Sequence, residues 1–170
     1  MGLRLRTPIR PIAPVRGWIN EAADVTASGG GPVDRTDSEA PATLIHFWGL
    51  SCPLCKEQMP TVRRWIEQFG PRGLRVIGVH TPLTRDDQDD VMVERMVRAL
   101  ALQHPIALDQ EGEVASAYQV DAVPTYFIYD RDRLLRYRHT GYQAEKPVER
   151  MVERLLNEAE HKPAGDRPAA

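Results

Sequence analysis

The sequence predicts an α/β protein with a central mixed sheet, helices on both faces of the sheet and an N-terminal extension. Two observations lead to this class. Short apolar runs alternate with amphipathic segments along most of the 170 residues, which is the pattern of strands connected by helices. Near the end, apolar runs at 124–129 and 134–139 flank the turn at 130–133, which indicates a hairpin and hence an antiparallel part of the sheet.

The expected elements follow one another in a regular order. Apolar residues recur at intervals of three and four in the helical segments and are nearly continuous in the buried strands. Pro60 lies inside the first helix and should kink it. In chain order we expect a strand at 43–48, a helix at 53–69, a strand at 74–79, a helix at 87–103, a strand at 105–109, a short helix at 111–118, the hairpin and a last helix that opens near Pro147.

Length and composition predict one domain. We expect a domain at 17–160, a basic flexible arm at 1–16 and a flexible tail at 161–170. With a net charge of −2, nothing argues for a nucleic acid as partner. No apolar run reaches the ~20 residues of a membrane-spanning helix. The N-terminus lacks the apolar core of a signal peptide, so the sequence as written predicts a cytoplasmic protein, or an extracytoplasmic one if an export signal is missing.

The two cysteines form the candidate site. Cys52 and Cys55 lie where the first long strand ends and a helix begins. Unpaired N–H groups and the positive end of the helix dipole stabilise a thiolate there, and the thiolate is the form that attacks disulfides. Cys55 lies one helical turn further on, close enough to resolve a mixed disulfide formed at Cys52. Pro53 suits the first helical position because that position needs no donor.

Two other interpretations of the cysteine pair remain open. The pair could be structural, although it closes almost no loop. It could also bind zinc, but a zinc site needs two further ligands at suitable spacing. The five histidines are scattered along the chain, at His46, His80, His104, His139 and His161. We therefore expect neither a metal nor an organic cofactor.

Residues on both sides of the cysteines, and a second segment far downstream, match one known family. The matching residues are Phe47, Trp48, Cys52, Pro53, Leu54, Cys55, Lys56, Pro60 and the segment 120–130. They resemble the active-site segment and the cis-proline strand of the thioredoxin-like superfamily. The residues from Gly78 to Pro82 onward are similar to the TlpA/ResA-type branch, and to the thioredoxin-like domain attached to some bacterial disulfide-transport proteins.

The resemblance implies a thioredoxin fold and a thiol–disulfide oxidoreductase, more often a reductant. It would act on protein disulfides or dithiols together with a redox partner protein. Pro124 should be a cis-proline beside the cysteines, and Val123 should offer its backbone to an extended substrate; without the resemblance, Pro124 would be an ordinary strand-initiating proline. Trp48 and Pro53 complete the candidate substrate-binding residues, although Trp48 could equally be part of the core.

One position departs from the family pattern. His46 stands six residues before Cys52, where many thioredoxins have a buried acid that manages the proton of the second cysteine. A neutral histidine can accept a proton, so His46 is a candidate for proton handling. The alternative is a hydrogen-bonded histidine of the core.

Two other functions are alternatives to disulfide exchange. Peroxiredoxins share the fold, and a thiol peroxidase would carry a threonine three residues before the nucleophile, where this chain has Gly49. Copper-binding modules of the same fold use a wider cysteine spacing and a later histidine. Both patterns differ from the sequence.

Overall fold

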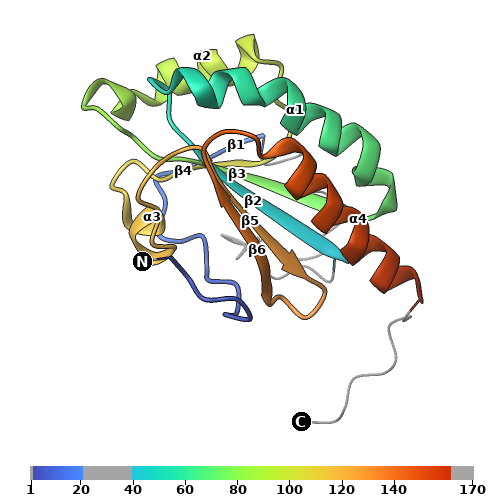
Figure 1. The fold of residues 1–170 in the computed structure, drawn as a ribbon. Helices are drawn as coiled ribbons and strands as arrows, with labels where there is room; N and C mark the ends of the chain where they lie inside the picture. The colour runs from blue at the N-terminus through green and yellow to red at the C-terminus, as the bar shows by residue number, and fades with distance from the viewer. Residues whose placement is uncertain (1, 21–39, 162–170) are drawn as a thin grey trace.

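The computed structural model describes residues 2–20 and 40–161, and its centre is a six-stranded sheet with the order β1-β4-β3-β2-β5-β6 (Figure 1). Residues 27–39, whose Gly-, Ser- and Asp-rich sequence predicts a loop, and most of the expected tail lie outside the described residues. The elements are β1 (Trp18–Ile19), β2 (Ala42–Trp48), α1 (Pro53–Phe69), η2 (Gly70–Arg72), β3 (Leu74–His80), η3 (Asp86–Gln88), α2 (Asp90–Ala99), β4 (Ile106–Leu108), α3 (Glu113–Ala117), β5 (Thr125–Asp130), β6 (Leu135–Thr140) and α4 (Glu145–His161).

The sheet is mixed, as the sequence predicts. The central strand β2 pairs in parallel with β3 and antiparallel with β5, and the β5–β6 hairpin closes one side. On the other side β4 is parallel to β3, and the short β1 is antiparallel to β4. In this register His46 of β2 lies opposite Gly78 of β3 and Tyr126 of β5.

Three helices cover one face of the sheet. In Figure 1, α1, α2 and α4 lie together above the strands, and α3 lies on the opposite side. The core under α1 contains Met59, Val62 and Trp65, which are almost completely buried. Among the described residues, no helix is both long and apolar enough to cross a bilayer.

The N-terminal segment packs on the second face of the sheet, beside α3. Ile9 and Ile12 are buried in the core of that face. The backbone N–H of Arg6 donates to the carbonyl oxygen of Leu135, at the start of β6 (2.7 Å), and the N–H of Leu135 donates to the carbonyl oxygen of Thr7 (2.9 Å). The packing of this segment differs from the basic flexible arm that the sequence predicts at 1–16. Two isoleucines among its prolines and arginines supply apolar surface that the sheet buries.

The helix expected at 87–103 is shorter and is preceded by a separate turn. η3 ends before Asp89, whose carboxylate accepts the N–H groups of Val91 and Met92 (3.0 and 3.2 Å) and so caps the N-terminus of α2. At the other end Ala101 has φ of 52°, a left-handed conformation that stops the helix. The break at Asp89 leaves Asp87 in a turn outside α2, where it is buried.

Candidate active site

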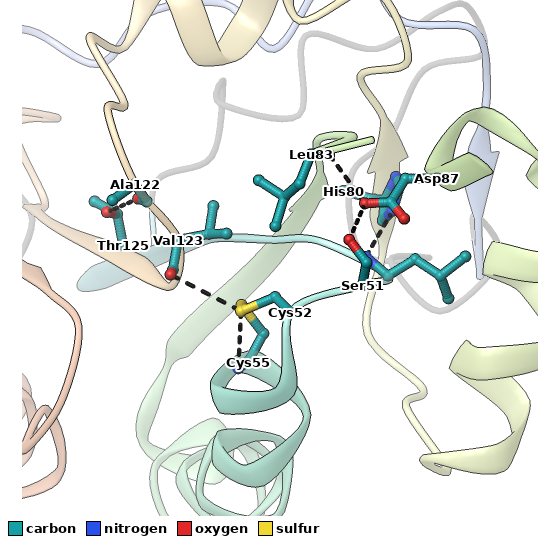
Figure 2. The surroundings of a disulfide bond; sticks show 10 residues. Ser51, Cys52, Cys55, His80, Leu83, Asp87, Ala122, Val123 and Thr125 are labelled. Carbon is teal, nitrogen blue, oxygen red and sulfur yellow. Dashed lines mark hydrogen bonds between the residues drawn. A yellow bond between two sulfur atoms is a disulfide. The ribbon is translucent and has the colours of Figure 1, made fainter. Parts of the chain in front are cut away.

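Cys52 and Cys55 form a disulfide at the N-terminus of α1 (Figure 2). Cys52 is the N-cap residue of the helix, and its sulfur accepts the N–H of Cys55 at 3.1 Å. Pro53 follows as the first helical residue and is exposed. Cys52 is 6% exposed and Cys55 is 1% exposed, so Cys52 is the one nearer to solvent. The arrangement is a redox-active Cys-x-x-Cys site held in its oxidised form.

The loop before β5 brings a second segment to the disulfide. The Val123–Pro124 peptide bond is cis, which is the isomer that the resemblance implies. The carbonyl oxygen of Val123 lies 3.8 Å from Sγ of Cys52. Thr125 fixes this loop, because its hydroxyl donates to the carbonyl oxygen of Ala122 (2.6 Å). The fold thus unites two segments that are 71 residues apart in sequence, as Figure 2 shows.

Trp48 lies behind the cysteines and does not reach the surface. Its side chain is fully buried, and its ring meets the ring of His80 edge to face with centroids 5.0 Å apart. Of the predicted substrate-binding residues, Pro53 is exposed and Val123 half-buried, while Trp48 has no exposed surface to offer. The position of Trp48 in a strand buried on both faces explains this difference.

His46 is paired with a second buried histidine. Nε2 of His46 lies 2.7 Å from Nε2 of His104, and the side chain of Tyr126 stacks beside His46. Burial, and after it the neighbouring His104, hold the pKa of His46 well below its usual value. Burial also lowers the pKa of His104 to about 4. At neutral pH both rings are therefore uncharged, and one donates a hydrogen bond to the other.

His46 and Cys55 belong to the same layer of the structure. Side chains alternate along a strand, so His46 shares a face of β2 with Leu44 and Trp48. Both of these neighbours pack in the core that contains Cys55. The histidine pair therefore lies under α1, on the side of the sheet that carries the disulfide.

A polar network behind the cysteines was missed by the sequence reasoning. It links Leu50 and Ser51, the residues before Cys52, to His80, Asp87 and Gln110. The helix expected at 87–103 would have placed Asp87 in its first turn, and His80, at the end of the preceding strand, was a residue that could approach the site but had no assigned role. Local patterns indicated this network only weakly. The burial of Asp87 and Gln110 depends on the packing of η3 against the loop after β4, which no local pattern predicts.

The sequence matches the model of the AhpC/TSA family over residues 20–138. The chain therefore belongs to this family of redoxins. Together with the fold and the Cys52–Cys55 site, this match defines a thiol–disulfide oxidoreductase with a thioredoxin-like fold.

Individual relatives agree with this class. The chain is 32% identical over 158 residues to the thiol-disulfide oxidoreductase YkuV of Bacillus subtilis, covering 93% of this chain and 100% of YkuV. It is 25% identical to a thiol-disulfide oxidoreductase ResA of Bacillus thuringiensis, over 77% of this chain and 73% of ResA. Among solved structures, a thioredoxin-like protein in the oxidised form superposes with a TM-score of 0.77 at 29% identity, covering 92% of this chain and 99% of that one.

Proposed function

We propose that Cys52 attacks disulfides of protein substrates and that Cys55 resolves the mixed disulfide. The observation that carries this assignment is the place of Cys52 at the N-cap of α1, where its sulfur accepts a backbone N–H and is the more exposed of the two. A thiolate at this position is stabilised by the helix N-terminus. Cys55 lies in the first turn of α1 and is almost completely buried, so it is less accessible to a substrate than Cys52.

The two steps conserve atoms and electrons. The Cys52 thiolate attacks one sulfur of the substrate disulfide, whose S–S bond breaks as the other substrate sulfur leaves as a thiolate. Cys55 then loses its proton and attacks Sγ of Cys52, which releases the second substrate thiolate. Two electrons have passed to the substrate, and the product is the Cys52–Cys55 disulfide seen in the structure.

Val123 supports a proposal for substrate binding. Its carbonyl oxygen lies beside Sγ of Cys52, so a peptide that pairs with the Val123 backbone would bring its own sulfur to the nucleophile. Pro124, which follows Val123, is buried. Pro53, the exposed residue directly after Cys52, would contact the same peptide.

These roles predict different phenotypes for the two cysteine variants. Cys52→Ser should lower the rate of protein disulfide reduction by at least about 100-fold, because it removes the attacking sulfur. Cys55→Ser should accumulate mixed disulfides with substrate, detected by non-reducing gels and mass spectrometry. If Cys55→Ser captures nothing while Cys52→Ser keeps its activity, the assignment of roles is reversed.

We propose that the direction of the reaction is reduction of substrates. Pro53 has no N–H to donate, and within the described part of the chain Sγ of Cys52 accepts a backbone hydrogen bond from the Cys55 amide alone. With fewer donors the Cys52 thiolate of the reduced form is less stabilised, so the Cys52–Cys55 disulfide is a weaker oxidant. The reduction potential of the pair should therefore lie nearer to about −270 mV than to about −120 mV. A value close to the upper figure would contradict this direction.

We further propose that the His46–His104 pair accepts the proton of Cys55 during the second step. The pair is neutral, buried and in the layer that contains Cys55, so an unprotonated ring nitrogen is present on that side of the sheet. Because the pKa of both rings is lowered, the pair would hold the proton only in passing. His46→Leu should slow release of the mixed disulfide at neutral pH but leave its formation unchanged. Stopped-flow measurement of both steps checks this, and equal effects on the two steps would refute it.

A further inference from the structure

The two residues that lead into Cys52 are each held by a buried side chain from another segment. The N–H of Leu50 donates to Nε2 of His80 at 3.2 Å, and Oγ of Ser51 donates to Oδ2 of Asp87 at 2.8 Å. His80 is 0% and Asp87 is 1% exposed. Figure 2 shows both side chains reaching the turn from the side away from Val123. The chemistry proposed above uses neither of them.

The hydrogen bonds of His80 determine its tautomer. Because Nε2 accepts from Leu50, the proton of the neutral ring must lie on Nδ1, which donates to Oε1 of Gln110 (2.9 Å). The amide nitrogen of Gln110 in turn donates to Oδ1 of Asp90 (2.7 Å) and to the carbonyl oxygen of Asp87 (3.3 Å). Every group in this chain of contacts has a partner, so the orientation of His80 is fixed.

Asp87 secures the same turn from a second side. Its carboxylate accepts hydrogen bonds from the backbone N–H of Leu83 (2.9 Å) and the hydroxyl of Thr84 (3.2 Å), in addition to the Ser51 hydroxyl. Burial raises the pKa of Asp87, but the hydrogen bonds from Leu83, Ser51 and Thr84 outweigh burial and lower it overall. Asp87 is therefore an anion that binds the β3–α2 loop to the turn.

We propose that His80 is a positioning residue for disulfide exchange, which holds the Leu50 amide and thereby the turn that presents Cys52. The proposal rests on the proposed function of the cysteine pair. Only the neutral imidazole can do this, because a protonated ring carries N–H on both nitrogens and would face the Leu50 N–H with a second donor. Protonation of His80 therefore releases the turn, and the reactivity of Cys52 falls with it.

The surroundings of His80 set the pH at which its protonation releases the turn. The groups that face the ring are Trp48 of β2, Gln110 after β4, Asp87 of η3 and Asp90 of α2. Burial lowers the pKa of His80, and the bond to Gln110 and the two carboxylates raise it by less, so the pKa lies below its usual value. His80 is therefore neutral at pH 7, and the release belongs to acid conditions.

Substitutions at His80 test the proposal through the reactivity of Cys52. His80→Leu removes the acceptor and should lower kcat/KM for protein disulfide reduction about tenfold, as expected when a reacting group is slightly misplaced. It should also shift the pKa of the Cys52 thiol, measured by the pH dependence of its alkylation. His80→Gln keeps an acceptor for Leu50 and a donor, so it should retain most of the activity. The matched control is His161→Gln, at the exposed end of α4.

The pH profile distinguishes positioning from a merely structural role. The wild-type rate should fall as the pH is lowered, in part because His80 becomes protonated. His80→Gln cannot titrate, so it should lack the part of the fall that His80 causes. Lower thermal stability with an unchanged rate per folded molecule and an unchanged Cys52 pKa would overturn the proposal, as would identical acid limbs in wild type and His80→Gln. If His80→Leu does not fold, the His80→Gln profile decides alone. A wild-type protein without exchange activity would instead refute the proposed function.

Discussion

At the scale of single residues, the molecule contains three buried histidines that are held neutral. They are His46, His80 and His104, and burial is the largest cause of the lowered pKa in each case. In the unfolded chain these histidines titrate near the ordinary value of about 6.5. The unfolded state therefore binds more protons than the folded state once the pH falls below that value.

This difference predicts that the protein loses stability in mild acid. Between pH 6.5 and the lowered pKa values, the free energy of unfolding should fall by about 1.4 kcal/mol per pH unit for each such histidine. Above about pH 7 the three histidines are neutral in both states, so they add nothing to the pH dependence of the free energy of unfolding. His46→Leu should reduce the slope of the free energy of unfolding against pH by about 1.4 kcal/mol per pH unit, the contribution of one proton. Urea unfolding at a series of pH values measures this slope. Leu5→Ala, at an exposed side chain that does not titrate, should leave the slope as it is.

At the scale of elements, the close approach of β2, β3 and β4 requires Gly78. A Cβ atom on Gly78 would lie 3.1 Å from Nε2 of His46, 3.2 Å from Nε2 of His104 and 3.0 Å from Cγ1 of Ile106. These distances are shorter than ordinary contacts, and all three neighbours are buried. The histidine pair therefore depends on a residue without a side chain between its two members.

Gly78→Ala should separate the pair and destabilise the sheet. We expect a loss of about 1–3 kcal/mol in the free energy of unfolding, the usual range for overpacking in a core. Gly70→Ala is the matched control, because a Cβ there meets nothing within 4 Å and its backbone is right-handed helical. Equal stability of the Gly78→Ala and wild-type proteins in thermal or urea unfolding would show that the strands can separate without cost.

The same elements show which features local sequence patterns can predict and which they cannot. Local patterns predicted α1 and the place of Cys52 at its N-terminus, because strand, cysteine and amphipathic helix follow one another directly. The pairing of His46 with His104 could not be predicted, because their 58-residue separation is closed only by the order of the strands. Asp87 was missed for a similar reason, since its burial depends on a turn that breaks away from α2.

At the scale of the whole molecule, the N-terminal segment ties the two sides of the sheet together. It bonds with the start of β6 through Arg6 and with the end of β4 through Arg16, whose backbone N–H donates to Leu108 (2.9 Å). Between these points Ile12 is 3% exposed and packs under the sheet. The hydroxyl of Tyr118, after α3, donates to the carbonyl oxygen of Arg10 (2.5 Å).

Removing one anchor of this segment should cost as much as a core substitution. Ile12→Ala should lower the free energy of unfolding by about 2–4 kcal/mol, because it removes buried apolar surface and leaves a cavity. Leu5→Ala, at a side chain that is 62% exposed, should change it by less than about 0.5 kcal/mol. Denaturant unfolding of the two variants checks the contrast, and equal effects would mean that the segment does not hold the sheet.

The hydrogen bonds of Arg6 and Arg16 also fix an order of events during synthesis. The ribosome makes the N-terminal segment before its partners Leu108 and Leu135, which lie far downstream in the chain. Closing such long loops costs chain entropy, so these pairings are expected late in folding. Ile9 and Ile12 therefore precede in the chain the strands that bury them, and they lack these partners while the cysteine site is made.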